Sequence, residues 1–185
     1  MSARRRPKVF HEMDIGAGVN AWAISNRARK NPSKNYLATD FKFEKTDYKW
    51  VRGKGDVPRP FPKNLHFTVG AALTAINKAR REGVTVKKIV IAMGVDMLLN
   101  PHYLGKIGKH ASSILEQGGE IYFISTWEPK VFKGHVVPRF EKLGYTFKQL
   151  RANKDRQYEY SGKAMTATER YRFTLREYVF TLNKT

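Results

Sequence analysis

The chain has 185 residues, 41% hydrophobic and 28% charged, a composition typical of globular rather than disordered proteins. It contains no cysteine, which excludes disulfides, thiolate metal ligands and cysteine nucleophiles. The 35 Lys and Arg residues outnumber the 16 Asp and Glu residues and give a formal net charge of +19, which favours a polyanionic partner, nucleic acid above all.

Targeting and metal-binding patterns are absent from the sequence. No apolar run approaches the ~18 residues of a membrane span and no secretory signal is present, so we expect a cytoplasmic protein without a membrane partner. Residues 1–8 are a basic arm that contains Arg4, Arg5 and Arg6. The histidines show no paired metal-ligand spacing, and we expect no metal site. No linker divides the chain, so residues 1–185 are interpreted as one domain.

Apolar periodicity predicts strands that alternate with helices along the chain. Predicted strands cover 8–15, 35–41, 65–70, 87–95 and 120–126, and predicted helices cover 20–30, 71–83, 102–119 and 136–144. Two more strands, 145–152 and 176–183, follow as an antiparallel pair. Residues 42–64 are a basic, irregular insertion, of a length that is usually functional or disordered. This order predicts an α/β fold with helices on both faces of a doubly wound, mostly parallel sheet.

A glycine turn follows the first predicted strand, with the sequence Asp14-Ile-Gly16-Ala-Gly18. In such sheets ligands bind beyond the carboxyl ends of the strands, where this turn lies. A dinucleotide fingerprint would place Ala21 at its third glycine position. The acid directly before the glycines instead suits a cationic or amine-bearing ligand. Asp40 ends the second strand and is placed to accept hydrogen bonds from a ribose.

These residues resemble the first motif of the class I S-adenosylmethionine-dependent methyltransferases, acid-x-Gly-x-Gly. The order of seven strands, ending in an antiparallel pair, is similar to that Rossmann-like family over nearly the whole chain. The resemblance implies S-adenosylmethionine as cofactor, with Asp14 and Gly16 against its methionine part, the donor over Gly16 and Gly18, and Asp40 on the ribose hydroxyls. Residues 70–72, Gly-Ala-Ala, stand where the family often has an acid near the adenine.

Several methyl acceptors are disfavoured by the sequence. Without cysteine, the C5-pyrimidine methyltransferases that attack the ring with a thiolate are excluded. The segment after the fourth strand, MGVDMLLNP, lacks the Pro-Pro-aromatic motif of exocyclic amine methylation. Guanine N7 and the ribose 2′-hydroxyl remain, and guanine N7 needs mainly alignment because its lone pair is already exposed.

The segments NPSKNYLATDF, LEQGGEIYFISTWE and TATE (166–169) resemble the tRNA guanine-N7 methyltransferases. This resemblance implies RNA modification, with tRNA favoured and guanine N7 as the first interpretation. The acceptor nucleotide would enter between Asp96 and the segment from Thr166 to Glu169. Asp96 and Glu169 are therefore the candidate catalytic residues.

Two alternatives stay open beside that interpretation. A ribose 2′-O-methyltransferase uses a Lys-Asp-Lys-Glu set, for which the sequence offers Lys8, Asp96, Lys130 and Glu177. A non-catalytic RNA-binding module on a degenerate methyltransferase fold is the second alternative, favoured by the missing third-strand acid. A DNA or protein substrate also remains open, because positive charge distinguishes DNA from RNA poorly.

RNA is the expected partner, and basic and aromatic residues are its candidate contacts. Arg4, Arg5 and Arg6 would hold phosphates, and Trp50 in the insertion would stack on a base. Lys130 and Thr166 are further candidate substrate contacts. The sequence does not predict an oligomeric state.

Overall fold

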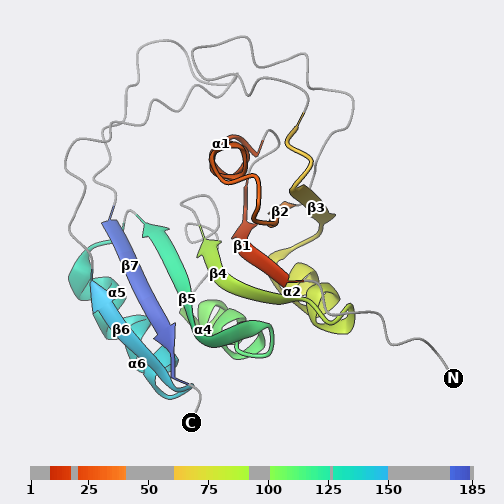
Figure 1. Cartoon of the computed structure of the whole chain (residues 1–185). Coiled ribbons are helices and arrows are strands. Elements are labelled where there is room, and N and C mark those ends of the chain that lie inside the picture. The colour runs from red at the N-terminus through yellow and green to blue at the C-terminus, as the bar shows by residue number, and fades with distance from the viewer. Residues whose placement is uncertain are drawn as a thin grey trace, which may run out of the picture.

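The computed structural model describes residues 9–17, 21–40, 61–91, 101–125, 127–149 and 176–183, which build a seven-stranded sheet. Its strands are β1 (Val9–Ile15), β2 (Tyr36–Asp40), β3 (Leu65–Val69), β4 (Thr85–Ile91), β5 (Leu115–Ser125), β6 (Tyr145–Gln149) and β7 (Arg176–Leu182). They lie in the order β3-β2-β1-β4-β5-β7-β6 (Figure 1). All neighbours are parallel except β7, which is antiparallel to both β5 and β6. The predicted α/β sheet with a C-terminal antiparallel pair is confirmed.

Helices cover both faces of the sheet (Figure 1). On one face α1 (Trp22–Lys30) buries Ile24 and Ala28 against Tyr36 and Ala38 of β2. On the other face lie α2 (Ala72–Arg81), α4 (Pro101–Ala111), α5 (Pro129–His135) and α6 (Val137–Glu141), packed over the larger hydrophobic cluster. None of the described helices is long and apolar enough to cross a membrane.

Aromatic side chains close the core beneath β5, β7 and β6. The ring of Phe132 stacks on Tyr178 with 3.9 Å between centroids, and Phe140 stacks on Phe180 at 4.3 Å. Gly108 of α4 allows this packing, because a Cβ atom at that position would lie 2.8 Å from the Phe140 ring. The sheet and the α5–α6 pair are therefore locked together by ring contacts.

The predicted helix over 102–119 is wrong beyond its third turn. Helix α4 ends at Ala111, and β5 begins at Leu115. Ile114 and Leu115 satisfy a helical stripe as well as a strand, so periodicity alone did not separate the two. Strand β5 is also irregular in its pairing with β4. Val86 of β4 pairs with Leu115, and Lys88, two residues later, pairs with Glu120, five residues after Leu115. Three residues are therefore bulged out of the ladder.

The predicted helix over 136–144 corresponds to α6, which covers Val137–Glu141, and the helix before it, α5, was not predicted. Pro129 occupies the first turn of α5, where its missing N–H leaves no hydrogen bond unmade. The other predicted elements are confirmed with shifts of a few residues at their ends. For example, β4 begins at Thr85 rather than at residue 87, and residues 92–95 of the predicted strand lie outside the described residues.

Candidate functional site

The carboxyl ends of β1, β2 and β4 meet at the centre of the sheet, where Ile15 is paired with Thr39 on one side and Ile91 on the other. The chain turns sharply after Ile15. Gly16 has a φ of 75°, in the left-handed region that favours glycine. The N–H groups of Gly16 and Ala17 both donate to the carbonyl oxygen of Thr39 at 3.0 Å, which folds the turn over the end of β2.

Asp14 lies just below this turn and is buried, with 3% of its surface exposed. Its Oδ2 accepts a hydrogen bond from Nη2 of Arg27 at 2.8 Å. Its backbone oxygen accepts one from the Thr39 hydroxyl at 3.2 Å. Its other carboxylate oxygen, Oδ1, is buried without a hydrogen-bond partner among the described residues. An acceptor of this kind needs a donor, because a buried unsatisfied polar atom costs about 1–3 kcal/mol.

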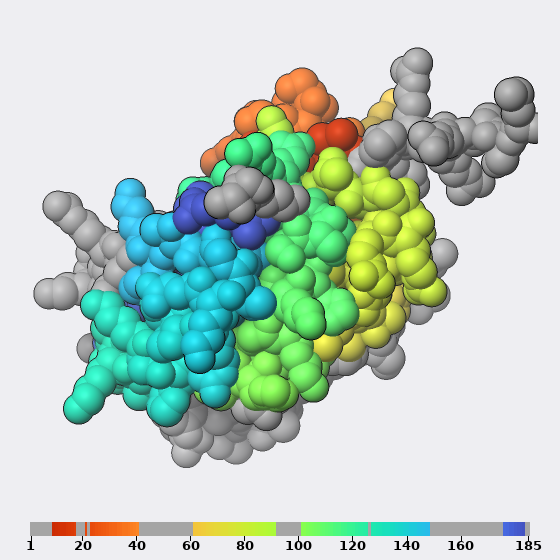
Figure 2. Space-filling view, turned by 90° about the horizontal axis from the view of Figure 1, so that it is seen from below, coloured from red at the N-terminus to blue at the C-terminus, as the bar shows by residue number. Residues whose placement is uncertain are grey.

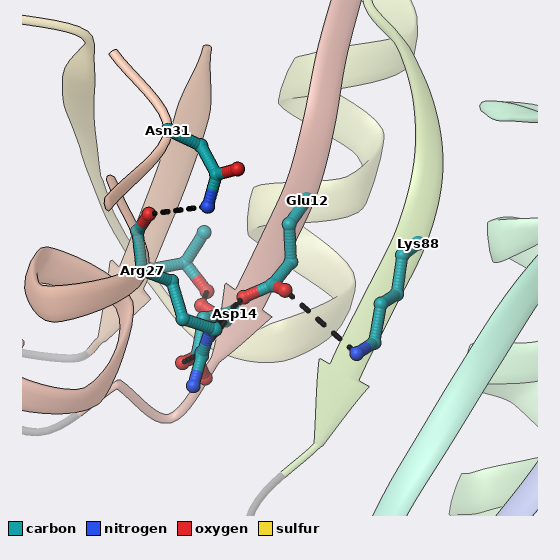
Figure 3. Close-up of polar contacts among 6 residues, drawn as sticks. Glu12, Asp14, Arg27, Asn31 and Lys88 are labelled. Carbon is teal, nitrogen blue, oxygen red and sulfur yellow. Dashed lines mark hydrogen bonds and ion pairs between the residues drawn. The ribbon is translucent and has the colours of Figure 1, made fainter. Parts of the chain in front are cut away.

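A second carboxylate shares the guanidinium of Arg27. Nε of Arg27 donates to Glu12 Oε1 at 2.7 Å, and Glu12 is 2% exposed. Figure 3 shows Arg27 reaching from α1 to both acids, while Lys88 approaches Glu12 from β4 with 3.9 Å between Nζ and Oε2. The Lys88 ammonium also lies 3.8 Å from the ring centroid of Tyr122 on β5. Two buried acids are thus held by two partly exposed cations.

The protonation of Asp14 is shifted by this environment. The pKa of its carboxyl is raised from 3.8 to about 7, because burial and the neighbouring charge of Glu12 raise it more than Arg27 lowers it. Near neutral pH this carboxyl therefore exchanges a proton with solvent. A bound cation would hold it in the charged form.

Asp40 ends β2 on the same face as Asp14. The register pairs Asp14 with Ala38, and alternation along β2 places Asp40 on the side of Ala38. The backbone oxygen of Asp40 accepts a hydrogen bond from the N–H of Gly70 at 2.9 Å, and the residue is half-buried. The structure therefore brings Asp14, Gly16 and Asp40 to one edge of the sheet, as the sequence predicted.

Lys130 and Glu177 lie on different elements, α5 and β7. Lys130 is exposed in the first turn of α5, and Glu177 is half-buried on β7 opposite Ile124. No ion pair joins the two within the described ranges. The remaining predicted site residues lie outside the described residues: Arg4, Arg5, Arg6, Lys8, Gly18, Trp50, Asp96, Thr166 and Glu169.

The sequence reasoning missed Glu12, Arg27 and Lys88. One signal was available for Glu12, since a residue two positions before Asp14 in a strand shares its face. Nothing in the sequence identified Arg27 as the partner among so many basic residues. Within the described ranges, no group of three His, Asp or Glu side chains could hold a metal ion.

No protein-family model matches the chain. No curated protein matches it either. Solved structures are similar in fold. The 16S rRNA methyltransferase KamB has 17% identity and a TM-score of 0.59, over 96% of this chain and 88% of its own. The 16S rRNA (adenine(1408)-N(1))-methyltransferase from Catenulisporales acidiphilia has 14% identity and a TM-score of 0.64, over 96% and 88%.

A third similar structure has a different kind of substrate in its name. It is the precorrin-6y C5,15-methyltransferase from Geobacter metallireducens GS-15, with 16% identity and a TM-score of 0.54, over 97% of this chain and 82% of its own. At these identities the likeness establishes the fold, which is the Rossmann-like fold of methyltransferases.

Proposed function

We propose that the protein is an S-adenosylmethionine-dependent methyltransferase that acts on RNA. The observation that carries the proposal is the buried Asp14 carboxylate with one oxygen unpaired among the described residues, directly below the glycine turn. The fold supports it, because the three similar structures named above are all methyltransferases by name and two of them act on 16S rRNA. The net charge of +19 supports an RNA substrate.

The described residues fit this cofactor. Oδ1 of Asp14 would accept a hydrogen bond from the ammonium of the methionine part, which satisfies the buried oxygen. Gly16 offers a backbone without a side chain, so a ligand can approach the turn closely. Asp40 would accept hydrogen bonds from the ribose hydroxyls. When bound, the cofactor supplies an electrophilic methyl group on sulfur.

The acceptor is proposed to reach the donor beside the end of β4, close to Asp96, with the 166–169 segment on its other side. Guanine N7 of a tRNA remains the first candidate, since it requires alignment and exclusion of water rather than an activated nucleophile. Asp96 and Glu169 would orient the base, and Lys130, Thr166, Trp50 and the arginines of the basic arm would hold the RNA. Ribosomal RNA is the second substrate class, favoured by the names of two similar structures.

The described residues bear differently on the two alternatives. A ribose 2′-O-methyltransferase would need Lys130 and Glu177 to approach one hydroxyl, and these two form no ion pair with each other within the described ranges. A non-catalytic RNA-binding module is favoured by Gly70, which follows β3 where an acid would help to hold the adenine, and has a φ of 148°. We place the activity in one cytoplasmic domain spanning residues 1–185.

Calorimetric titration of S-adenosylhomocysteine tests the cofactor site. We expect micromolar binding to the wild-type protein, loss of binding in Asp40→Ala, and unchanged binding in the control Glu141→Ala, an exposed acid at the end of α6. Transfer of tritiated methyl groups to purified tRNA and to ribosomal RNA then identifies the substrate, and nucleoside analysis identifies the atom. RNA binding without any cofactor binding would overturn the enzyme and leave the RNA-binding module.

A further inference from the structure

A cavity lies at the amino ends of the parallel strands, and the glycine turn lies at their carboxyl ends. Its volume is about 190 Å³, and it is lined by Phe10, Leu37, His66, Phe67, Thr68, Lys78, Ala79, Glu82 and Val84. Phe10, Leu37 and His66 are each the second residue of their strand, whereas Ile15 and Asp40 end β1 and β2 at the glycine turn. The cavity therefore opens where the parallel strands begin, between the edge strand β3 and the last turn of α2.

The walls of the cavity combine aromatic and polar groups. The rings of Phe10 and His66 meet edge to face, with 5.3 Å between centroids, and His66 is exposed. The Thr68 hydroxyl and the Glu82 carboxylate can pair with the edges of a planar polar ligand. Drug-sized ligands occupy roughly 300–1,000 Å³. A cavity of about 190 Å³ suits a smaller flat group, such as one nucleobase.

Lys78 lines the cavity, and two further cations lie in the same turn of α2. Lys78, Arg80 and Arg81 lie in the last turn of this helix, and all three are exposed. None of them forms an ion pair with a described residue. The helix dipole favours a cation at this end. Three cations within four positions also repel one another, so an external anion would relieve the repulsion.

The end of α1 brings more positive charge to the same edge. The side-chain amide of Asn64, just before β3, lies within hydrogen-bonding distance of the backbone oxygens of Ala28, Asn31 and Lys34. This hydrogen bonding joins the segment that carries Lys63 to the end of α1. Burial lowers the pKa of His11, and the charges of Lys34, Lys87 and Lys88 lower it further, while Glu12 acts in the opposite direction. Positive charge therefore lies on both faces of the sheet at this edge.

We propose that this edge is a second RNA-binding site, remote from the cofactor. The cavity would take one unstacked base of a single-stranded segment, with its ring against His66 and Phe10. Lys78, Arg80 and Arg81 would hold the neighbouring phosphates. The inference rests on the proposed RNA substrate and deepens it, because RNA must then contact both edges of the sheet.

Charge removal tests the phosphate-binding role of α2. The probe is a fluorescein-labelled single-stranded RNA of mixed sequence, titrated at several salt concentrations and followed by fluorescence anisotropy. The triple variant Lys78→Gln, Arg80→Gln and Arg81→Gln should bind roughly tenfold more weakly. Its salt slope should fall by about 2, or about 0.7 for each phosphate that the protein no longer neutralises. An equally large effect in the control below would mean that any positive charge serves, and would overturn the site.

The control removes the same charge from the other end of the molecule. Lys133 on α5, Lys142 directly after α6 and Lys148 on β6 are exposed, and β6 is the edge strand farthest from β3. Figure 2 shows α2 at one end of the lower surface and α6 with β6 at the other. The triple variant Lys133→Gln, Lys142→Gln and Lys148→Gln should bind the RNA within about twofold of the wild-type affinity, after correction for net charge.

Substitution of the rim histidine tests the cavity. His66→Ala should weaken RNA binding roughly tenfold because it removes the stacking surface, while His135→Ala, another exposed histidine, should have no effect. Circular dichroism melting checks that each variant is folded. Displacement of the RNA by poly-glutamate as effectively as by unlabelled RNA would show a site for any polyanion and overturn the base pocket.

Calorimetry with S-adenosylhomocysteine separates the two proposals. The α2 triple variant should bind it as the wild type does, because its substitutions lie at the opposite edge from Asp14. A wild type that binds the cofactor product but no RNA would overturn the RNA substrate and this site together. A wild type that binds and methylates RNA, with the α2 triple variant unaffected, would overturn the second site alone.

Discussion

The two faces of the sheet are stabilised in different ways. Beneath β5 and β7, Phe132, Tyr178, Phe140 and Phe180 fill the core with rings and need no charged partners. Beside β1, the face under α1 instead buries Glu12 and Asp14 and holds them with Arg27 and Lys88. Buried ion pairs seldom stabilise more than apolar packing of equal volume. The aromatic face therefore supplies stability, and burial of a carboxylate on the acidic face costs part of it.

The largest effect is expected from the aromatic face. Phe132→Ala should lower the free energy of unfolding by about 3–5 kcal/mol, because it removes a fully buried ring that stacks on Tyr178. Urea denaturation measures the change. The neighbouring Val131 is 44% exposed, and Val131→Ala should cost well under about 1 kcal/mol. Similar losses in both variants would show that this half of the core is not tightly packed.

The acidic face should make stability depend on pH. The pKa of Asp14 is about 7 in the folded protein and 3.8 for an ordinary aspartate, which represents the unfolded chain. The protonated carboxyl therefore makes its full contribution to the free energy of unfolding below about pH 4. That contribution is lost as the pH rises through about 7, which lowers the free energy of unfolding by up to roughly 4 kcal/mol.

The matched variant Asp14→Asn cannot titrate and should lack this slope. We expect the wild type to lose stability relative to Asp14→Asn between about pH 4 and pH 7.5, measured by urea denaturation across that range. Parallel curves for the two proteins would contradict the raised pKa.

Removal of the shared guanidinium should give a smaller effect. Arg27→Met leaves Glu12 and Asp14 without their main partner, and we expect a loss of about 2 kcal/mol at pH 8. This value lies below the range for fully buried pairs because the Arg27 side chain is 35% exposed. The loss should shrink at about pH 5, where Asp14 is protonated. The control is Lys30→Met, a change at an exposed position of the same helix. A loss of stability in Arg27→Met that does not depend on pH would refute the pairing of Arg27 with ionised Asp14.

The sequence predicted the elements that depend on local pattern. The glycine turn, the order of strands and the shared edge of Asp14 and Asp40 follow from neighbouring residues and from the rules of parallel sheets. It did not predict the Arg27 partnership, because any of many basic residues could have reached β1. It also misplaced the end of α4, since Ile114 and Leu115 fit both periodicities. The cavity depends on tertiary packing between β3 and α2, and a local sequence pattern cannot predict such packing.

The strand order has a consequence for synthesis on the ribosome. Val9 of β1 pairs with Thr85 of β4, 76 residues later in the chain (85 − 9 = 76). At translation rates of about 5–20 residues per second, β1 waits about 4–15 seconds for that neighbour to be made. During that interval the buried side chains of β1, such as Met13 and Ile15, have only part of their packing available. Slower translation would lengthen the interval, and nascent chains would then depend more on chaperones to keep β1 from pairing with other chains.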